Sequence, residues 1–515
     1  MTGKILLGKF EPALFWSLVL IHLTPVLSDH WCPTLDGPSH LNCARIMSDL
    51  WRGREQVSVF FALNPYPEPN ILGHIIMAST MLIAPAWVAE KLVLCLSIVG
   101  LAYAFRRFSL LISAERPWVS ALVMPFLLPF CFFMGFINFC LSLPLLLLVL
   151  AQVEKNLFAG SNKYPWALGA LFLLLYLAHL STFMLGAAVV AGRMMWWQFT
   201  NGRRGTSSDH RVFGRIILVM AAPLLLTIGF FLLHGSHAAA PHRFELMELL
   251  RWVVDGRAWI TFGELETPST RIIAVSILML AICGIGSSIK KGWSPKSLFW
   301  LIVSSFVFII YFLLPDTMAG GSLASPRLLL FAMLFISFWI ATAPLPDRLL
   351  GVGISALICA DFAHLIQVTD TSGSLAKEAI EFTSVASALE PSSVVLPLNY
   401  GDNWMHSNFS NYVGAERGAI VLDNFVANAP FSPVRWKPER LPYERIGNFS
   451  TSNAPCVSID AYREGSRPLV THVLTWKLND SVTDSCTNDV RRQLARDFEL
   501  LASSPNNDAR LYRRK

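Results

Sequence analysis

A short polar segment near the N-terminus carries the residue types best suited to chemistry in this chain of 515 residues. Asp36 stands directly before a Gly-Pro pair, and His40 follows four residues later. A carboxylate can act as a general base, and an imidazole can contact a phosphate, orient that carboxylate or join it in binding a metal. The alternative for Asp36 is structural, because aspartate at such a position often begins a turn or caps the next helix.

The elements that must position these residues are mostly membrane helices. Hydrophobic residues make up 54% of the chain and charged residues only 15%, whereas a typical soluble domain is about 25% charged. Charged residues form about 12% of residues 1–366 and about 22% of residues 367–515, so only the second part matches the soluble average. The composition predicts a multi-span membrane domain over 1–366 and a soluble domain over 367–515. The net charge of +6 is small for this length and does not indicate nucleic-acid binding. The oligomeric state stays open.

Apolar stretches of membrane-spanning length recur through the first 366 residues. A helix needs about 20 apolar residues to cross the hydrocarbon core of a bilayer. On this criterion we expect about eleven spans, with 164–198 holding either two short helices or one bent helix. The expected spans are 12–28, 87–105, 118–134, 137–153, 164–180, 182–198, 214–233, 271–289, 297–314, 327–345 and 348–366.

Lysine and arginine cluster in alternate loops, which predicts the orientation because basic loops stay in the cytoplasm. The N-terminus is then cytoplasmic, and the loops 29–86, 235–270 and 315–326 lie outside with the tail 367–515. We therefore expect an integral protein of a bacterial inner (plasma) membrane. The first span lacks a clear small-x-small cleavage site, so it is interpreted as an uncleaved helix rather than a signal peptide. The basic residues assigned to the cytoplasm include Lys4, Lys9, Arg106, Arg107, Arg116, Lys155, Arg203, Arg204, Lys290, Lys291, Lys296 and Arg348.

The first outer loop contains two further helical patterns. From His40 to residue 52, apolar residues recur at helical spacing, but the segment is too polar to span and should lie along the membrane surface. Prolines at 65, 67 and 69 break the chain, and an apolar helix is expected over 70–84 at the same interface. The alternative role for His40 is that of an ordinary interfacial polar residue.

This order of elements resembles the GT-C superfamily of integral membrane glycosyltransferases, which includes protein O-mannosyltransferases and bacterial lipid A aminoarabinose transferases. Members of that superfamily have one span, an outer loop with an acidic residue near that span, and two interfacial helices before the second span. The many-span body and the outward C-terminal domain also match, so the resemblance covers nearly the whole chain. The family's usual acidic pair is here Asp36-Gly37, which leaves a single carboxylate.

The resemblance implies transfer of a sugar from a polyprenyl-phosphate carrier to an acceptor outside the membrane. Asp36 is then the candidate base that deprotonates the acceptor hydroxyl. Asp29 is the rival carboxylate, although its place at the end of a span favours a structural role. His40 is a candidate substrate-binding residue. A divalent metal stays open as a cofactor, because Asp36 and His40 alone make an incomplete metal site.

A departing lipid phosphate also needs cations at the outer interface. Arg327 opens the tenth span against the positive-inside bias, and Arg243 lies in the loop 235–270. Both are candidate substrate-binding residues. The alternatives are that Arg327 only snorkels to the interface and that Arg243 is a solvated loop cation.

The tail mixes strand-like and helical patterns, which predicts a small α/β domain. Strands are expected at 393–397, 419–422 and 470–474, and helices at 376–389 and 490–501. Tyr412 is interpreted either as a sugar-stacking residue or as part of the core. Four of the nine cysteines fall in outer segments, which predicts the disulfides Cys32–Cys43 and Cys456–Cys486.

A second class of function competes with the transferase. A non-enzymatic polytopic protein, such as a transporter or an envelope-assembly factor, would have the same composition. A transporter usually shows internal repeats and several ionisable residues at mid-membrane, whereas here no repeat is found and most charges sit at span ends. The pattern therefore favours the transferase. The sequence does not define the sugar, the acceptor or the carrier length.

Overall fold

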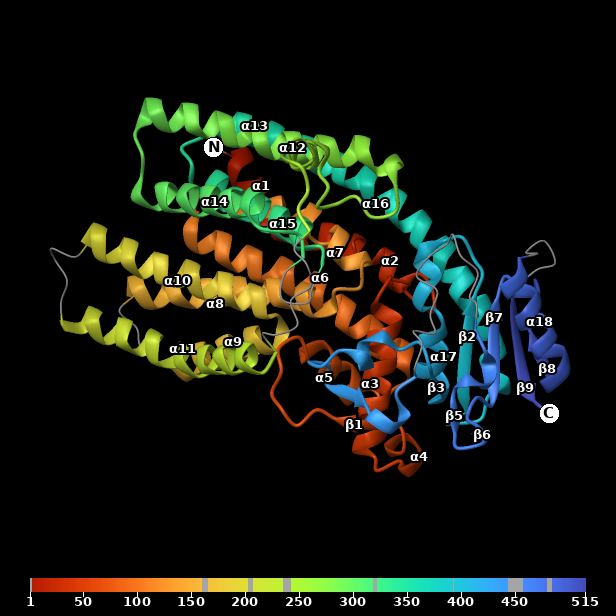
Figure 1. Ribbon diagram of the computed structural model, residues 1–515. Coiled ribbons are helices and arrows are strands. Elements are labelled where there is room, and N and C mark those ends of the chain that lie inside the picture. The colour runs from red at the N-terminus through yellow and green to blue at the C-terminus, as the bar shows by residue number, and fades with distance from the viewer. Residues whose placement is uncertain are drawn as a thin grey trace. The chain divides into compact units, whose positions relative to one another are not determined.

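The computed structural model describes residues 2–159, 165–201, 207–234, 242–317, 322–391, 393–442, 457–478 and 484–515. The chain divides into two compact units (Figure 1). The first unit contains Met1–Thr24, Cys95–Phe133 and Ile137–Asp370. The second unit contains Pro25–Leu94, Met134–Phe136 and Thr371–Lys515. The first long loop and the C-terminal tail therefore fold together, although they stand at opposite ends of the sequence.

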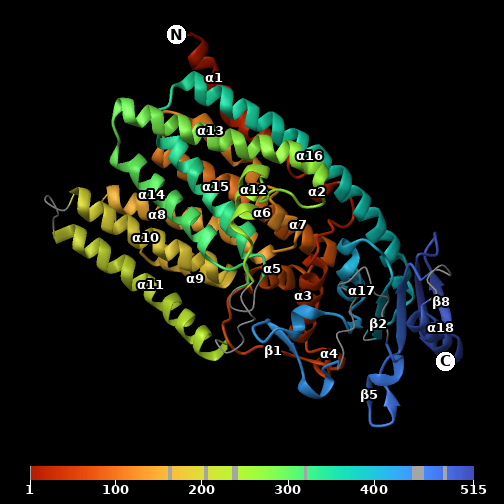
Figure 2. The same cartoon turned by 45° about the horizontal axis from the view of Figure 1, so that its top comes forward.

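The first unit is built from apolar helices. Helices α8 to α11 pack against one another, and α14 packs against α15, which also contacts α13 (Figures 1 and 2). Helices α6 and α16 continue from the first unit into the second. The bounds are α1 Thr2–Ile21, α6 Ala86–Ile112, η1 Pro117–Phe126, α7 Phe130–Phe133, α8 Ile137–Ala159, α9 Pro165–Ala178, α10 Leu180–Asn201, α11 Ser207–His234, α12 Leu246–Asp255, η3 Glu264–Glu266, α13 Thr267–Lys291, α14 Pro295–Leu313, α15 Ala324–Thr342 and α16 Asp347–Thr383.

Aromatic side chains fill the space between these helices. The Trp300 ring of α14 stacks on Phe335 of α15, with ring centroids 6.2 Å apart. Phe108 of α6 meets both Trp300 and Phe338 edge-on, at 5.3 and 4.8 Å. Edge-to-face and offset pairs of this kind add about 0.5–1.5 kcal/mol each beyond their burial. Helix α15 is buried along almost its whole length, so it forms the centre of this packing.

Among the described residues, seven helices are long and apolar enough to cross a membrane, where the sequence predicts about eleven spans. The protein is thus a helical membrane protein with seven candidate spans. Those spans are Ala86–Ile112, Ile137–Leu157, Val212–His234, Glu264–Lys291, Pro295–Leu313, Ala324–Thr342 and Asp347–Ala388.

The other four predicted spans take shorter or less apolar forms. Helix α1 ends at Ile21 and is followed by the short α2 (Thr24–Leu27), instead of running through 12–28. The segment 118–134 forms the 3-10 helix η1 and the one-turn α7, because Pro125 and Pro129 interrupt helical hydrogen bonding. The stretch 164–198 contains two helices, α9 and α10, separated at His179. Helix α10 carries Arg193, which pairs with Glu154 of α8 at 2.5 Å.

The second unit contains a small mixed sheet of five strands in the order β3-β2-β7-β9-β8. Strand β2 runs parallel to β3 and β7, whereas β9 is antiparallel to β7 and β8. Strands β2 and β7 are almost wholly buried, as expected for strands inside a covered sheet. The strand bounds are β2 Val394–Asn399, β3 Ile420–Val421, β4 Val434–Trp436, β5 Arg463–Glu464, β6 Arg467–Pro468, β7 His472–Trp476, β8 Phe498–Ser503 and β9 Ala509–Arg514.

Three short helices and one strand of the first long loop complete this unit. Strand β1 (Phe61–Leu63) pairs antiparallel with β4 of the tail. Helix α3 (Gly37–Trp51) packs against α5 (Leu72–Thr80) and against α17 (Ser410–Arg417), and α4 (Glu55–Ser58) follows α3. The predicted interfacial helices 40–52 and 70–84 correspond to α3 and α5. In the tail, α18 spans Ser485–Asp497, and short 3-10 turns lie at Ser384–Ala388, Trp404–Asn408, Phe425–Asn428, Pro438–Arg440 and Ile459–Ala461.

Three predictions for this unit need correction. The helix expected at 376–389 is not a separate element, because α16 continues to Thr383 and a 3-10 turn follows at Ser384–Ala388. The expected helix 490–501 ends at Asp497, because Phe498 begins β8 and its hairpin with β9. The predicted disulfide Cys32–Cys43 is wrong: Cys43 is a free, buried thiol whose Sγ lies 3.7 Å from the Ser432 hydroxyl. Cys486 is disulfide-bonded, and its predicted partner Cys456 lies outside the described residues.

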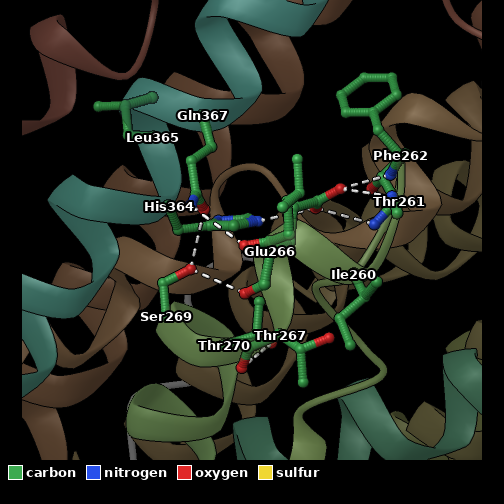
Figure 3. Close-up of polar contacts among 12 residues, drawn as sticks. Ile260, Thr261, Phe262, Glu266, Thr267, Ser269, Thr270, His364, Leu365 and Gln367 are labelled. Carbon is green, nitrogen blue, oxygen red and sulfur yellow. Dashed lines mark hydrogen bonds and ion pairs between the residues drawn. The ribbon is translucent and has the colours of Figure 1, made fainter.

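A buried carboxylate holds the turn between α12 and α13 of the first unit. Glu266 is 4% exposed, and its carboxylate accepts hydrogen bonds from the backbone N–H groups of Thr261, Phe262 and Gly263 at 2.9, 2.5 and 3.0 Å. His364 of α16 lies on its other side, with Nε2 3.2 Å from the carboxylate (Figure 3). The turn and α16 are therefore joined through one side chain.

We expect Glu266→Ala to lower the free energy of unfolding by about 3 kcal/mol, because buried backbone N–H groups lose their acceptor. Glu264→Ala is the matched control, since Glu264 is exposed two residues earlier. Denaturant titration of both variants in detergent measures the difference. Equal stability of the two variants would show that the Glu266 carboxylate does not hold the turn.

Candidate functional site

The backbone of Asp36 is held from several sides within the second unit. Its N–H donates to the Met134 carbonyl at 3.2 Å, and its own carbonyl accepts from the His40 N–H at 3.1 Å. The next residue, Gly37, donates its N–H to the Thr34 hydroxyl at 3.1 Å. Asp36 occupies the N-cap position of α3, yet its side chain makes no capping hydrogen bond. The half-buried carboxylate is therefore not used as the cap that its position suggests.

A close approach of two backbone segments fixes this geometry. Gly135 has φ +77°, a left-handed conformation that favours glycine. A Cβ atom at Gly135 would lie 2.4 Å from the Gly37 nitrogen and 2.8 Å from the Asp36 nitrogen. Only glycine fits there without moving the segment that carries Asp36.

Helix α3 is also tied to the tail by buried amide groups. The Asn408 side chain donates to the Leu35 carbonyl at 2.8 Å and accepts from the Ser39 hydroxyl at 3.0 Å. The Asn42 amide donates to the Asn411 side chain at 2.9 Å. Because buried polar groups are costly to leave unsatisfied, these bonds fix the start of α3 to α17 and the turn before it.

A second buried carboxylate, which the sequence analysis did not single out, supports the chain just before Asp36. Glu90 of α6 accepts a hydrogen bond from the Cys32 N–H at 3.1 Å and another from the Tyr412 hydroxyl at 2.8 Å. The Tyr412 ring stacks on Trp31, with centroids 4.3 Å apart. Tyr412 is fully buried, so the core-packing interpretation fits it and the sugar-stacking one does not.

His40 pairs with a second histidine. Its Nδ1 lies 3.0 Å from Nε2 of His74 on α5, close enough for one ring to donate to the other. Burial lowers the pKa of His40 to about 4 and that of His74 well below its usual value. Both rings are therefore neutral at physiological pH, and such a pair offers hydrogen bonds but no positive charge. Among the described residues, no group of three or more His, Cys, Asp or Glu side chains could hold a metal ion.

The predicted cations belong to the first unit, whereas Asp36 and His40 belong to the second. Arg327 lies in the first turn of α15, with its guanidinium 5.9 Å from the centroid of the Phe139 ring. Arg243 precedes α12 and is exposed, as expected for a solvated loop cation.

Another arginine of the first unit, Arg257, shares a neighbouring side chain with Arg327. It follows α12, half-buried, with its guanidinium 4.3 Å from the centroid of the Phe130 ring. Both Arg257 and Arg327 act electrostatically on the same buried side chain, Cys131. Burial lowers the pKa of Arg257, and the Glu266 carboxylate opposes that effect. In the sequence, Arg257 stands among apolar residues, directly after the helical pattern that ends near 253. A cation in such surroundings is the signal that could have identified it.

A similar protein is found by comparing structures but not by comparing sequences. The sequence matches no protein-family model and no curated protein. The structure, however, matches that of ArnT from Cupriavidus metallidurans bound to undecaprenyl phosphate, with a TM-score of 0.57 over 98% of both chains. The chain has the fold of ArnT.

This structural similarity covers nearly the whole chain, although the two sequences differ at most positions. The apo state of the same ArnT matches over 98% of both chains with a TM-score of 0.50, and identity is 11% in both comparisons. ArnT is a GT-C lipid A aminoarabinose transferase, so the resemblance to that architecture is confirmed. At this identity the comparison establishes the fold, and residue roles have to be argued from this chain itself.

We expect Gly135→Ala to destabilise the protein by roughly 3 kcal/mol, because the left-handed backbone and the close approach both exclude a Cβ atom. Gly192→Ala in α10 is the control, since a Cβ there meets no atom within 4 Å. Thermal unfolding followed by intrinsic fluorescence compares the two. If both variants unfold at the wild-type temperature, the backbone contact does not fix Asp36.

Proposed function

We propose that this protein is a membrane glycosyltransferase that moves a sugar from a polyprenyl-phosphate donor to an acceptor on the extracytoplasmic side. The observation that carries the proposal is the full-length fold shared with ArnT, whose structure contains undecaprenyl phosphate. Within the second unit, Asp36 is a carboxylate on a rigidly held backbone, and within the first unit Arg257 and Arg327 are half-buried cations.

The proposed topology follows from the basic residues. Arg106 and Arg107 lie near the C-terminal end of α6, Lys155 near that of α8, and Lys290 and Lys291 near that of α13. Placing these ends in the cytoplasm puts the first long loop and the tail outside. The N-terminus is then cytoplasmic and the C-terminus extracytoplasmic, in a bacterial inner membrane. Reporter fusions at residue 400 test this arrangement.

In the proposed reaction, Asp36 acts as the base. Its carboxylate takes the proton of the acceptor hydroxyl while the hydroxyl oxygen forms a bond to the anomeric carbon of the sugar. The bond from that carbon to the phosphate oxygen breaks, and its electron pair leaves with the polyprenyl phosphate. The side chain is half-buried at the start of α3, on a backbone that Met134 and His40 hold in place.

His40 stands four residues after Asp36, and therefore on the same side of the first turn of α3. Because its ring is neutral at physiological pH, it would bind the substrate by hydrogen bonding rather than by charge. We assign it a role in orienting the acceptor or the sugar.

The departing phosphate requires positive charge. We assign Arg327 and Arg257 to this role, because both guanidinium groups are withdrawn from bulk water and act on a common neighbour. Charge-assisted hydrogen bonds to phosphate are stronger in such surroundings than at the surface. Arg243 was also predicted to bind the phosphate. Because its side chain is exposed, water competes with the phosphate for its guanidinium group.

If Asp36 is the base, Asp36→Asn should reduce transfer by about 100-fold or more while leaving the fold intact. The assay follows release of undecaprenyl phosphate from a panel of undecaprenyl-phosphate-linked sugars, with envelope lipids as acceptors. Asp29→Asn is the matched control and should retain most of the activity. Full activity of Asp36→Asn would refute the role of this residue, and no release by the wild-type protein with any sugar would refute the transferase itself.

The phosphate assignment predicts that Arg257→Gln and Arg327→Gln each weaken binding of undecaprenyl phosphate by about tenfold or more. Binding of undecaprenol, which lacks the phosphate, should change little. Arg251→Gln is the control, because Arg251 is exposed in α12 and pairs with Asp255. Fluorescence quenching in nanodiscs measures all three. If the Arg251 variant loses as much affinity as the others, the loss comes from the lower overall positive charge and not from removal of a phosphate site.

A further inference from the structure

An open groove in the first unit contains none of the residues assigned to the proposed transfer reaction. Its volume is about 430 Å³, and its walls come from α1, α6 and α8. Three cations line it: Arg106 and Arg107 of α6 and Lys155 of α8. The remaining lining side chains are large and mostly apolar, namely Trp16, Tyr103, Leu110 and Leu111.

One of the three cations is already used by the fold. Arg106 makes a two-pronged ion pair with Glu11 of α1, at 2.6 and 2.7 Å, and also donates to the Ser120 hydroxyl at 2.9 Å. Its guanidinium additionally lies 4.7 Å from the centroid of the Phe15 ring. Arg106 therefore anchors α1 to α6, and its guanidinium group is already engaged by these contacts.

The other two cations are not neutralised by any described acidic residue. Arg107 donates to the Tyr103 hydroxyl at 3.1 Å, and across the described part of the chain neither Arg107 nor Lys155 forms an ion pair. Lys155 is exposed, and its neighbour Glu154 is committed to Arg193. The groove thus carries two uncompensated positive charges.

The rim of the groove is apolar and exposed. Tyr103 is 47% exposed and Leu111 is 36% exposed. In a helical membrane protein such side chains face lipid acyl chains rather than water. A ligand that fits therefore has a negative head beside Arg107 and Lys155 and an apolar body along α1 and α6.

We propose that this groove binds an acidic glycerophospholipid, with its phosphate between Arg107 and Lys155 and an acyl chain against Leu111 and Trp16. Basic pockets between membrane helices commonly hold acidic headgroups. The site is separate from the proposed phosphate cations: Phe139, which Arg327 covers, and Lys155 are 16 residues apart on α8, or roughly 24 Å along the helix.

Native mass spectrometry of the full-length protein tests this proposal, with dioleoyl phosphatidylglycerol as the probe and dioleoyl phosphatidylcholine as the zwitterionic reference. The double variant Arg107→Gln/Lys155→Gln should bind phosphatidylglycerol roughly 25-fold more weakly than the wild type, about fivefold for each cation. Lys290→Gln/Lys291→Gln removes the same charge from the end of α13 and is the matched control. Thermal unfolding confirms that both double variants are folded.

Three results would overturn the proposal. Unchanged phosphatidylglycerol binding in the Arg107/Lys155 variant would show that these cations do not hold the lipid. An equal loss in the Lys290/Lys291 control would reveal an effect of overall charge. Equally tight binding of soluble glycerol phosphate would identify an anion site without a place for the acyl chain. A selective loss in the first variant alone, with no binding of glycerol phosphate, supports it.

Discussion

The arrangement around Asp36 depends on one close contact between two stretches of backbone. Met134 and Gly135 meet Asp36 and Gly37 at distances that leave no room for a Cβ atom. A backbone contact of this kind is stiff, because it involves no side-chain rotamers that could absorb a shift. The buried carboxylate of Glu90 and the amides of α3 and α17 add to this support, but each of them acts on the chain beside Asp36 rather than on Asp36 itself.

The elements near Asp36 could be predicted from the sequence because their signals are local. Helical spacing and three prolines placed α3 and α5 to within a few residues, and buried strands β2, β3 and β7 followed from runs of apolar residues. The prediction failed where apolar runs contain helix breakers. Residues 118–134 are apolar enough to span, but the prolines within them produce a 3-10 helix and a single turn. Hydropathy alone cannot distinguish these outcomes.

The residues that support the candidate site were harder to predict from the sequence. Glu90 was visible as a carboxylate near a span end, but its partners Cys32 and Tyr412 are 58 and 322 residues away. The Cys32–Cys43 disulfide was predicted from spacing, whereas helix α3 directs Cys43 toward Ser432 of the tail. Arg257 was not predicted, because the number of charges in a loop points to cations in clearly polar loops. Long-range packing decides these positions, and a single sequence does not record it.

The pairing of the first long loop with the tail has a consequence for biosynthesis. Asn42 bonds to Asn411, 369 residues later, and β1 has no strand partner other than β4 among the described residues. At about 5–20 residues per second, translation takes roughly 20–75 seconds to supply that partner. During this interval α3 and β1 expose apolar surface and unpaired backbone while the membrane helices are being inserted. The second unit therefore closes only after the tail segment that holds Asn411 and β4 has been made, and chains truncated before that segment cannot assemble the surroundings of Asp36.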